Sequence, residues 1–286
     1  MSVFLHNNHL NAAEDDFLYH FGFGKYTKDL AQFADVKFVC TGGSAHRFEL
    51  YAKLFSKETA LPCSENLALS DRYVVYKTGP VLWINHGIGA PSLSIMLNET
   101  LKMLAYAGAK DVSFIRLGTS GGVGVAPGTV VISDGAINGE LKQKYVQWIA
   151  GERVERETHL DEGMRAELAQ SAAHLDIPHA QGKTLCADDF YEGQMRLDGF
   201  FCNYESEDKF DFLRKLQSLG VRNIEMESTC FSATLLRAGV KGAICCVTLL
   251  NRMDGDQVKL DKDTYLEFEM RPFRVVTAYI RKQIDA

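Results

Sequence analysis

The sequence lacks the long apolar runs and the basic excess that mark several large classes of protein. No apolar run reaches the ~20 residues that span a bilayer, and the N-terminus lacks the basic-then-apolar pattern of a secretory signal. The 31 basic and 37 acidic residues give a net charge of −6, which argues against nucleic acid as the main partner. We therefore expect a cytoplasmic protein that binds neither membrane nor nucleic acid.

Paired cysteines and metal-binding motifs are missing as well. The seven cysteines include no Cys-x-x-Cys pair, and their odd number is typical of reduced thiols that pack as small hydrophobic side chains. The eight histidines show none of the spacings that hold zinc. We expect reduced cysteines and no bound metal.

Repeats, low-complexity segments and linkers are also absent, which favours a single domain over residues 1–286. Residues 1–35 are polar and irregular, and we expect them to form an N-terminal arm. Beyond the arm, short apolar runs typical of buried strands alternate with helical patterns. The expected strands are residues 36–40, 73–77, 81–86, 112–117, 129–133 and 243–249, and the expected helices are 91–107, 206–218, 225–238 and 274–282. This alternation predicts an α/β fold, a three-layer sandwich with a central mixed β-sheet flanked by helices.

An arginine stands where one of these strands runs into glycines. Arg116 precedes Gly-Thr-Ser-Gly-Gly at residues 118–122, and ligands of α/β sheets bind at the carboxyl ends of strands. A glycine loop lets backbone N–H groups approach an anion, Thr119 adds a hydroxyl, and Arg116 offers a fork that matches phosphate. The same pattern also fits a glycine turn whose arginine pairs with a structural carboxylate. A nucleotide-binding P-loop is excluded because no Gly-Lys-Ser/Thr follows.

A second glycine turn follows the first expected strand. Residues 41–47 read Thr-Gly-Gly-Ser-Ala-His-Arg and open a helical run, and a helix N-terminus attracts anions. Its glycine spacing does not match the dinucleotide fingerprint, so a nicotinamide-dependent oxidoreductase is disfavoured.

Two polar clusters lie further along the chain. Residues 189–196 place Gln194 and Arg196 two positions apart, on one face if the segment is extended. An amide that both donates and accepts, beside a guanidinium that only donates, suits a pyrimidine edge, although a solvated polar loop has the same composition. Residues 223–228 begin a helix with Glu225 and Glu227, which either bind ribose hydroxyls or complement the helix dipole.

Taken together, these segments resemble the nucleoside phosphorylase family, and most closely its animal-type uridine phosphorylases. The resemblance is carried by residues 36–44, 115–122, 189–198 and 224–228, with 35–77, 79–128 and 248–252 also similar. It implies a homodimer with shared active sites and reversible, phosphate-dependent cleavage of uridine to uracil and ribose 1-phosphate. Inorganic phosphate is then a co-substrate, and no cofactor is required.

The resemblance also assigns roles to single positions that bind phosphate and ribose. The phosphate-binding positions are Gly43, Arg47, Arg72, Arg116 and Thr119. The ribose-binding positions are His20, Met226 and Glu227. Among them, Arg72 and His20 are implied to reach the site of the neighbouring subunit, where His20 meets the ribose 5′-hydroxyl.

The base-binding positions implied by the resemblance lie in the second half of the chain. They are Phe190, Gln194, Arg196, Leu249, Leu250 and Arg252. Phe190 is expected against the base, the two leucines line its pocket, and Arg252 stands behind it. The expected catalytic residues are Arg116, Gln194 and Arg196.

The choice of base follows from chemistry as well. Purine-cleaving relatives carry a Ser-Asp pair whose acid can protonate a purine, whereas this chain has Asn251 and Arg252 there. Arginine is no proton donor at neutral pH, so a pyrimidine is favoured. A purine-type phosphorylase and a catalytically silent nucleoside-binding homologue are the alternatives.

Overall fold

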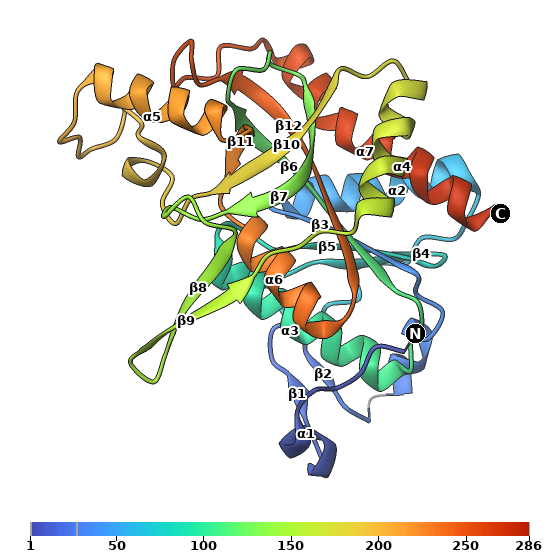
Figure 1. The fold of residues 1–286 in the computed structure, drawn as a ribbon. Helices are drawn as coiled ribbons and strands as arrows, with labels where there is room; N and C mark the ends of the chain where they lie inside the picture. The colour runs from blue at the N-terminus through green and yellow to red at the C-terminus, as the bar shows by residue number, and fades with distance from the viewer. Residues whose placement is uncertain (1, 27, 286) are drawn as a thin grey trace. The chain divides into compact units, whose positions relative to one another are not determined.

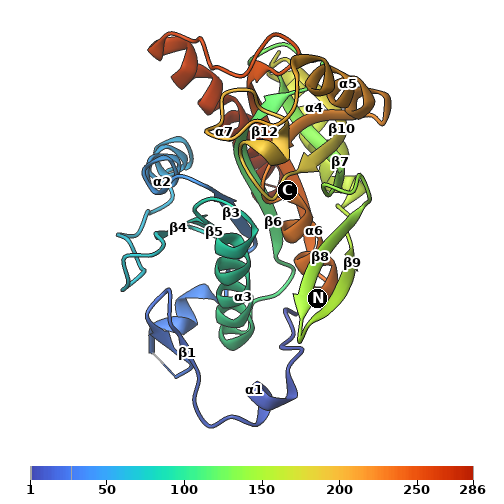
Figure 2. The same ribbon diagram turned by 90° about the vertical axis from the view of Figure 1, so that its left-hand side faces the viewer.

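The computed structural model describes residues 2–26 and 28–285 and divides the chain into two compact units (Figures 1 and 2). The first unit comprises the residues up to Arg116 and Thr234–Gly242. The second comprises Leu117–Ala233 and the residues from Ala243 onward. The expectation of one domain over the whole chain stays a prediction.

In the first unit, β3 (Phe38–Gly42) is the inner strand. It runs parallel to β5 (Val81–Asn85) on one side and to the start of β6 (Ser113–Gly122) on the other. β4 (Val75–Thr78) adds to β5 in the antiparallel sense. All five residues of β3 and of β5 are buried, as expected for strands covered on both faces.

Helices cover these strands. α2 (Ala45–Thr59) packs on β4 and β5, and α3 (Ala90–Ala107) lies on their other side (Figure 2). Between α2 and the strands the core is aromatic, since Trp83 is fully buried and lies within 5.4 Å of the Phe55 ring, centroid to centroid. In this unit the result is three layers.

The N-terminal arm has short elements of its own. They are α1 (Asn8–Ala12), β1 (Phe17–Leu18), β2 (Phe23–Gly24) and the 3-10 helix η1 (Lys28–Phe33). Burial of Leu18 and Phe21 fixes the arm to the unit. The predicted arm is therefore folded onto the protein, as far as the described residues go.

In the second unit, β10 (His179–Cys186) is parallel both to β7 (Val130–Ile137) and to β11 (Val221–Glu225). β12 (Lys241–Asn251) pairs with β7 in the antiparallel sense. With antiparallel and parallel ladders present in both units, the expected mixed sheet is confirmed.

The α-helices α4 (Glu162–His174), α5 (Ser206–Ser218) and α7 (Lys262–Ile284) belong to this unit. α6 (Ser228–Ala238) begins in this unit and ends in the first. α4 packs on β7, β10 and α7, and α5 packs on β11 over a hydrophobic cluster that includes Leu213, Leu216 and Ile224. The expected α/β class, with a mixed sheet flanked by helices, is confirmed.

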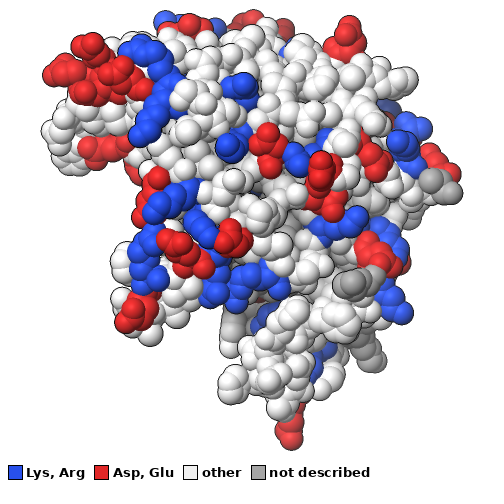
Figure 3. Space-filling view, viewed as in Figure 1, with Lys and Arg blue, Asp and Glu red and all other residues white. Residues whose placement is uncertain are grey.

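A hairpin of β8 (Lys144–Ile149) and β9 (Glu152–Glu157) extends away from β7 and β10 in Figure 1. Its charges are paired across and along the strands, as Lys144 contacts Glu157 and Arg153 contacts Glu155. Figure 3 shows basic and acidic side chains intermingled on this face.

Candidate active site

The glycine turn after β3 opens helix α2. Gly43 lies so near the backbone of Gly87 that a Cβ at this position would come within 3.0 Å of the Gly87 carbonyl oxygen. Ser44 caps the helix, because its hydroxyl accepts the N–H of Arg47 at 3.3 Å. The turn thus places Gly43 and Arg47 at the positive end of a helix, which suits an anion.

Arg116 stands level with this turn on the neighbouring strand. It is the register partner of Thr41 in the parallel β3–β6 ladder, and its side chain is 3% exposed. The expectation that a glycine loop follows it is wrong. Residues 118–122 continue β6, and Gly121 and Gly122 pair with β11. Thr119 is half-buried within this extended segment.

His20 and Arg72 lie close together in the first unit. The Ser70 hydroxyl donates to the His20 carbonyl oxygen and accepts the N–H of Arg72 at 3.3 Å. The Arg72 side chain is exposed beside Asp71, with Nε 3.6 Å from a carboxylate oxygen. The His20 ring bonds through Nδ1 to the carboxylate of Glu99 at 2.7 Å. The two residues implied to serve the neighbouring subunit therefore share one anchor.

Gln194 and Arg252 form the centre of the candidate base site in the second unit. Both are buried, with Gln194 4% and Arg252 0% exposed. Arg252 donates from Nη1 to Gln194 Oε1 at 3.3 Å and from Nη2 to the Gln194 carbonyl oxygen at 2.8 Å. Arg252 therefore contacts both the side chain and the backbone of Gln194. The expected place of Arg252 behind the base pocket stays a prediction.

Arg196 reaches the same cluster by a route that the sequence did not predict. The segment is not extended, because Glu192–Gln194 form the 3-10 helix η2 and Met195 has a positive φ of 53°. Arg196 forms a two-pronged ion pair with Asp198, at 2.8 Å from both Nε and Nη2. Its guanidinium also lies 4.4 Å from the centre of the Phe190 ring. Phe190 itself is half exposed, at 45%.

Asp256 ties this cluster together. Its carboxylate accepts from Arg252 Nε at 2.9 Å, Lys209 Nζ at 3.0 Å and the N–H of Leu197 at 2.9 Å, while its carbonyl oxygen accepts from Arg196 Nη2 at 2.7 Å. Burial acts to raise the pKa of Asp256, but these hydrogen bonds and the nearby positive charges outweigh burial and lower it.

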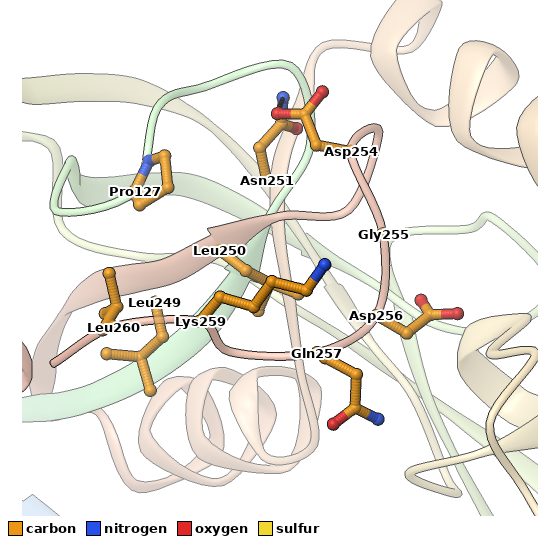
Figure 4. A pocket seen from close by; sticks show the side chains of 10 residues that line it. All are labelled: Pro127, Leu249, Leu250, Asn251, Asp254, Gly255, Asp256, Gln257, Lys259 and Leu260. Atoms are coloured by element: carbon orange, nitrogen blue, oxygen red, sulfur yellow. Dashed lines mark hydrogen bonds between the residues drawn. The ribbon is translucent and has the colours of Figure 1, made fainter.

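A pocket of about 230 Å³ lies under the loop that follows β12 (Figure 4). Leu249 and Leu250 line it, as expected of the base pocket, together with Pro127, Asn251 and residues 254–260 other than Val258. Gln194, Arg196 and Phe190 are not among its lining residues. The pocket and the cluster share Asp256, which lines the pocket and accepts hydrogen bonds from Arg252 and Arg196.

Glu225 and Glu227 have different surroundings. Glu225 caps α6, because its two carboxylate oxygens accept the N–H groups of Glu227 and Ser228, each at 3.0 Å. Glu227 is 5% exposed and Met226 is half-buried at the same turn. The capping role at this turn therefore belongs to Glu225.

Three polar residues at these places escaped the sequence reasoning: Glu99, Lys209 and Asp256. Each is a buried charged residue, but a single sequence gives no sign of which charges are buried. Within residues 2–26 and 28–285, no three or more His, Cys, Asp or Glu side chains are arranged to hold a metal ion. In the same part of the chain, no helix is both long and apolar enough to cross a membrane.

Comparison with known proteins identifies the family. The model of the phosphorylase superfamily matches residues 37–281. The chain belongs to this superfamily. The uridine and thymidine phosphorylase of Caenorhabditis elegans is 66% identical over 269 residues, which are 94% of this chain and 91% of that protein.

Solved and curated relatives from Schistosoma mansoni extend the comparison. A crystal structure of its uridine phosphorylase in complex with uracil matches with a TM-score of 0.93 at 42% identity, covering 96% of this chain and 98% of that one. The inactive uridine phosphorylase B is 39% identical over 282 residues, which are 96% of this chain and 95% of that protein. The resemblance to animal-type uridine phosphorylases is confirmed.

Proposed function

We propose that this protein is a uridine phosphorylase, a pentosyltransferase that converts uridine and inorganic phosphate reversibly to uracil and ribose 1-phosphate. The observation that carries the proposal is the contact between Arg252 and Gln194. A guanidinium only donates hydrogen bonds, so the atom of the Gln194 amide that faces Arg252 is the oxygen. The amide nitrogen, which carries two hydrogens to donate, is thereby turned away from Arg252.

This orientation fits the edge of uracil. Uracil presents two carbonyl oxygens on either side of an N–H. The Gln194 nitrogen donates to one oxygen, its own oxygen uses a second lone pair to accept the N–H, and Arg196 donates to the other oxygen. Cytosine has an amino group in place of one carbonyl oxygen and a bare ring nitrogen in place of the N–H. The amino group would set a donor against the donor Arg196, and the bare nitrogen would set an acceptor against the Gln194 oxygen.

The remaining site residues bind phosphate, the second substrate, and the ribose of the nucleoside. Gly43, Arg47, Arg116 and Thr119 hold phosphate, and Met226 and Glu227 hold the ribose. These roles are the ones that the family resemblance implies. Phosphate attacks C1′ as the bond to N1 of uracil breaks, with inversion through an oxocarbenium-like state. The electron pair of that bond leaves with uracil, and the hydrogen bonds at its two oxygens stabilise the developing charge.

The active form is a homodimer in which Arg72 and His20 complete the partner's site. Large apolar side chains next to these residues in the sequence are exposed: Tyr19, beside His20, is 75% exposed, and Leu69, beside Ser70, is 75% exposed. A cluster of large exposed apolar side chains is typical of a protein interface. We place the enzyme in the cytoplasm, where its cysteines stay reduced.

Two relatives define the alternatives. The name of the Caenorhabditis elegans relative includes thymidine, so thymidine is a second candidate substrate for this chain. The inactive Schistosoma mansoni relative makes a silent homologue the competing proposal. Against a silent homologue stands the presence of every polar position that the resemblance assigns, from Arg47 to Arg252.

An absorbance assay of the purified protein tests the proposal. We expect uracil release from uridine only when phosphate is present, and rates on cytidine and inosine lower by several orders of magnitude, because buried hydrogen-bonding groups would be left unsatisfied. Equal rates on cytidine and uridine would contradict the roles of Gln194 and Arg196. Phosphate-dependent cleavage of inosine alone would establish the purine alternative, and no cleavage of any nucleoside the silent homologue.

A further inference from the structure

Glu99 is a buried charged residue of the first unit that has no role in the proposed reaction. It lies in the middle of α3 and is 7% exposed. Its carboxylate accepts the His20 N–H at 2.9 Å from Oε2, the Phe21 N–H at 3.1 Å and the His20 ring at 2.7 Å. A buried carboxylate is stabilised by such a set of donors, and in return it fixes the groups that donate.

The ring contact decides which imidazole nitrogen is left for a substrate. An ionised carboxylate only accepts hydrogen bonds, so Nδ1 of His20 carries the hydrogen. Nε2 is then the nitrogen that remains for another group, and the side chain of His20 is 36% exposed. Glu99 thus sets both the tautomer and the direction of the ring.

The backbone of His20 is held as well. Its N–H is bonded to Glu99, and its carbonyl oxygen accepts the Ser70 hydroxyl that also bonds the N–H of Arg72. The Tyr73 ring lies 6.2 Å from the imidazole, centroid to centroid.

We infer that Glu99 is a positioning residue that holds Nε2 of His20 toward the 5′-hydroxyl of the nucleoside in the partner's site. The inference rests on the proposed function, in which His20 meets that hydroxyl. Glu99 does not touch the substrate and acts through His20 alone. Its contribution is therefore confined to substrates that possess a 5′-hydroxyl.

The test compares uridine with 5′-deoxyuridine, which lacks that hydroxyl. Glu99→Gln removes the charge and lets the ring turn or change tautomer. We expect kcat/KM for uridine to fall about tenfold, mainly through KM, and kcat/KM for 5′-deoxyuridine to change less than about twofold, as for the loss of one hydrogen bond. His20→Asn should give the same pattern, and the double variant should be no worse than His20→Asn, because residues that act through one contact are not additive.

Asp16→Asn is the matched control. Asp16 also joins the arm to α3 through a carboxylate, with Lys102 Nζ at 2.6 Å and the Tyr106 hydroxyl at 2.5 Å, but it does not bond His20. If Glu99→Gln acted only by loosening the arm, Asp16→Asn would also lower kcat/KM for uridine more than kcat/KM for 5′-deoxyuridine. That result would overturn the inference. Equal losses on both substrates in Glu99→Gln, or losses additive with those of His20→Asn, would overturn it too.

A measurement on the wild-type protein keeps the inference testable if Glu99→Gln does not fold. Long-range ¹⁵N NMR, with the His20 signals assigned by comparison with His20→Asn, reports which ring nitrogen carries the hydrogen. Protonated Nδ1 with bare Nε2 in the neutral ring supports the inference, and the opposite tautomer overturns it. If the wild type did not cleave uridine in the presence of phosphate, the proposed function would be refuted. The NMR measurement of the His20 tautomer does not depend on that activity, so the two failures can be told apart.

Discussion

At the scale of single residues, Gly121 was singled out by the sequence, but its role in the structure differs from the expected one. The glycines after Arg116 were expected to expose backbone N–H groups to an anion. In the structure, a Cβ on Gly121 would lie 3.1 Å from both Cγ and Cδ of Arg252. The glycine therefore makes room for a buried arginine, and through that arginine for the Gln194 amide.

Asp256 connects recognition to stability at the same scale. Removing one partner of a buried ion pair leaves the other charge without compensation, which costs about 3–5 kcal/mol. Here two cations, Arg252 and Lys209, depend on this single carboxylate. We expect Asp256→Asn to lower the free energy of unfolding at pH 7 by at least about 3 kcal/mol.

The pH dependence of that loss follows from the direction of the pKa shift. The pKa of Asp256 is lowered in the folded protein, so its contribution is complete above the unfolded value of about 4 and is lost as pH falls through the folded value. The gap between wild type and Asp256→Asn should therefore narrow below about pH 4, as urea unfolding at pH 7, 5, 4 and 3 would show. Asp254→Asn, on the same loop but exposed, is the control. A gap independent of pH would mean that the carboxylate charge is not responsible.

At the scale of elements, the sequence predicted the strands and helices whose ends are set by the local hydrophobic pattern. It missed the ends that are set by contacts with distant parts of the chain. The buried strands β3 and β5 and the helices α3 and α5 lie within two residues of their expected ranges, because apolar runs and caps are local signals. β6 is longer than expected because its glycines lie in extended backbone against β11.

Helix boundaries failed for identifiable reasons. α7 begins at Lys262 rather than at residue 274, with Pro272 inside the helix, and Asp261 caps its start through the N–H groups of residues 263 and 264. α6 begins at Ser228 rather than at residue 225, because Glu225 is occupied in capping. Of the candidate site, single residues could be taken from the family resemblance, whereas the buried partners Glu99, Lys209 and Asp256 required the structure.

The start of α6 yields a prediction that separates capping from substrate binding. Glu225→Gln keeps one acceptor oxygen and loses the other, so we expect a loss of about 1 kcal/mol in unfolding free energy. Glu227→Gln should lower kcat/KM for uridine by about two orders of magnitude, as for a residue that binds ribose in the transition state. Thermal unfolding and steady-state kinetics, measured on both variants, show which residue caps the helix and which binds ribose. A stability loss in Glu227→Gln with unchanged kinetics would reverse the two roles.

At the scale of the whole molecule, the expected site residues are distributed over both compact units. His20, Gly43, Arg47, Arg72 and Arg116 belong to the first unit, and the remaining positions belong to the second. Two of the first group, His20 and Arg72, are anchored together through Ser70 beside exposed apolar side chains. This arrangement is what a dimer with shared sites requires, since each chain must present both residues outward on one surface.

Complementation between inactive chains tests the shared site. An Arg72→Ala chain is defective in the partner's site, and a chain with Gln194→Ala and Arg196→Ala is defective in its own. In a mixed dimer with two-fold symmetry, one site collects both lesions and the other collects none. Random assortment makes about half of the dimers mixed, so about a quarter of wild-type activity should return. Mixed dimers isolated with two affinity tags, one on each chain, should show about half of wild-type activity.

The decisive comparison replaces Arg72→Ala with Arg47→Ala. Arg47 lies in the same unit, but its role is within its own chain, so both lesions of the mixed dimer then fall in cis and each of its two sites contains one. We expect activity to return with Arg72→Ala and to stay absent with Arg47→Ala, measured as phosphate-dependent uracil release from tagged mixed dimers. Recovery in neither pair would place Arg72 in its own chain's site. Recovery in both would show that Arg47 and Arg72 act in the same sense, so that the assignment of Arg47 to its own chain would be wrong. Recovery confined to the Arg72 pair is the result expected when Arg72 crosses the interface and Arg47 does not.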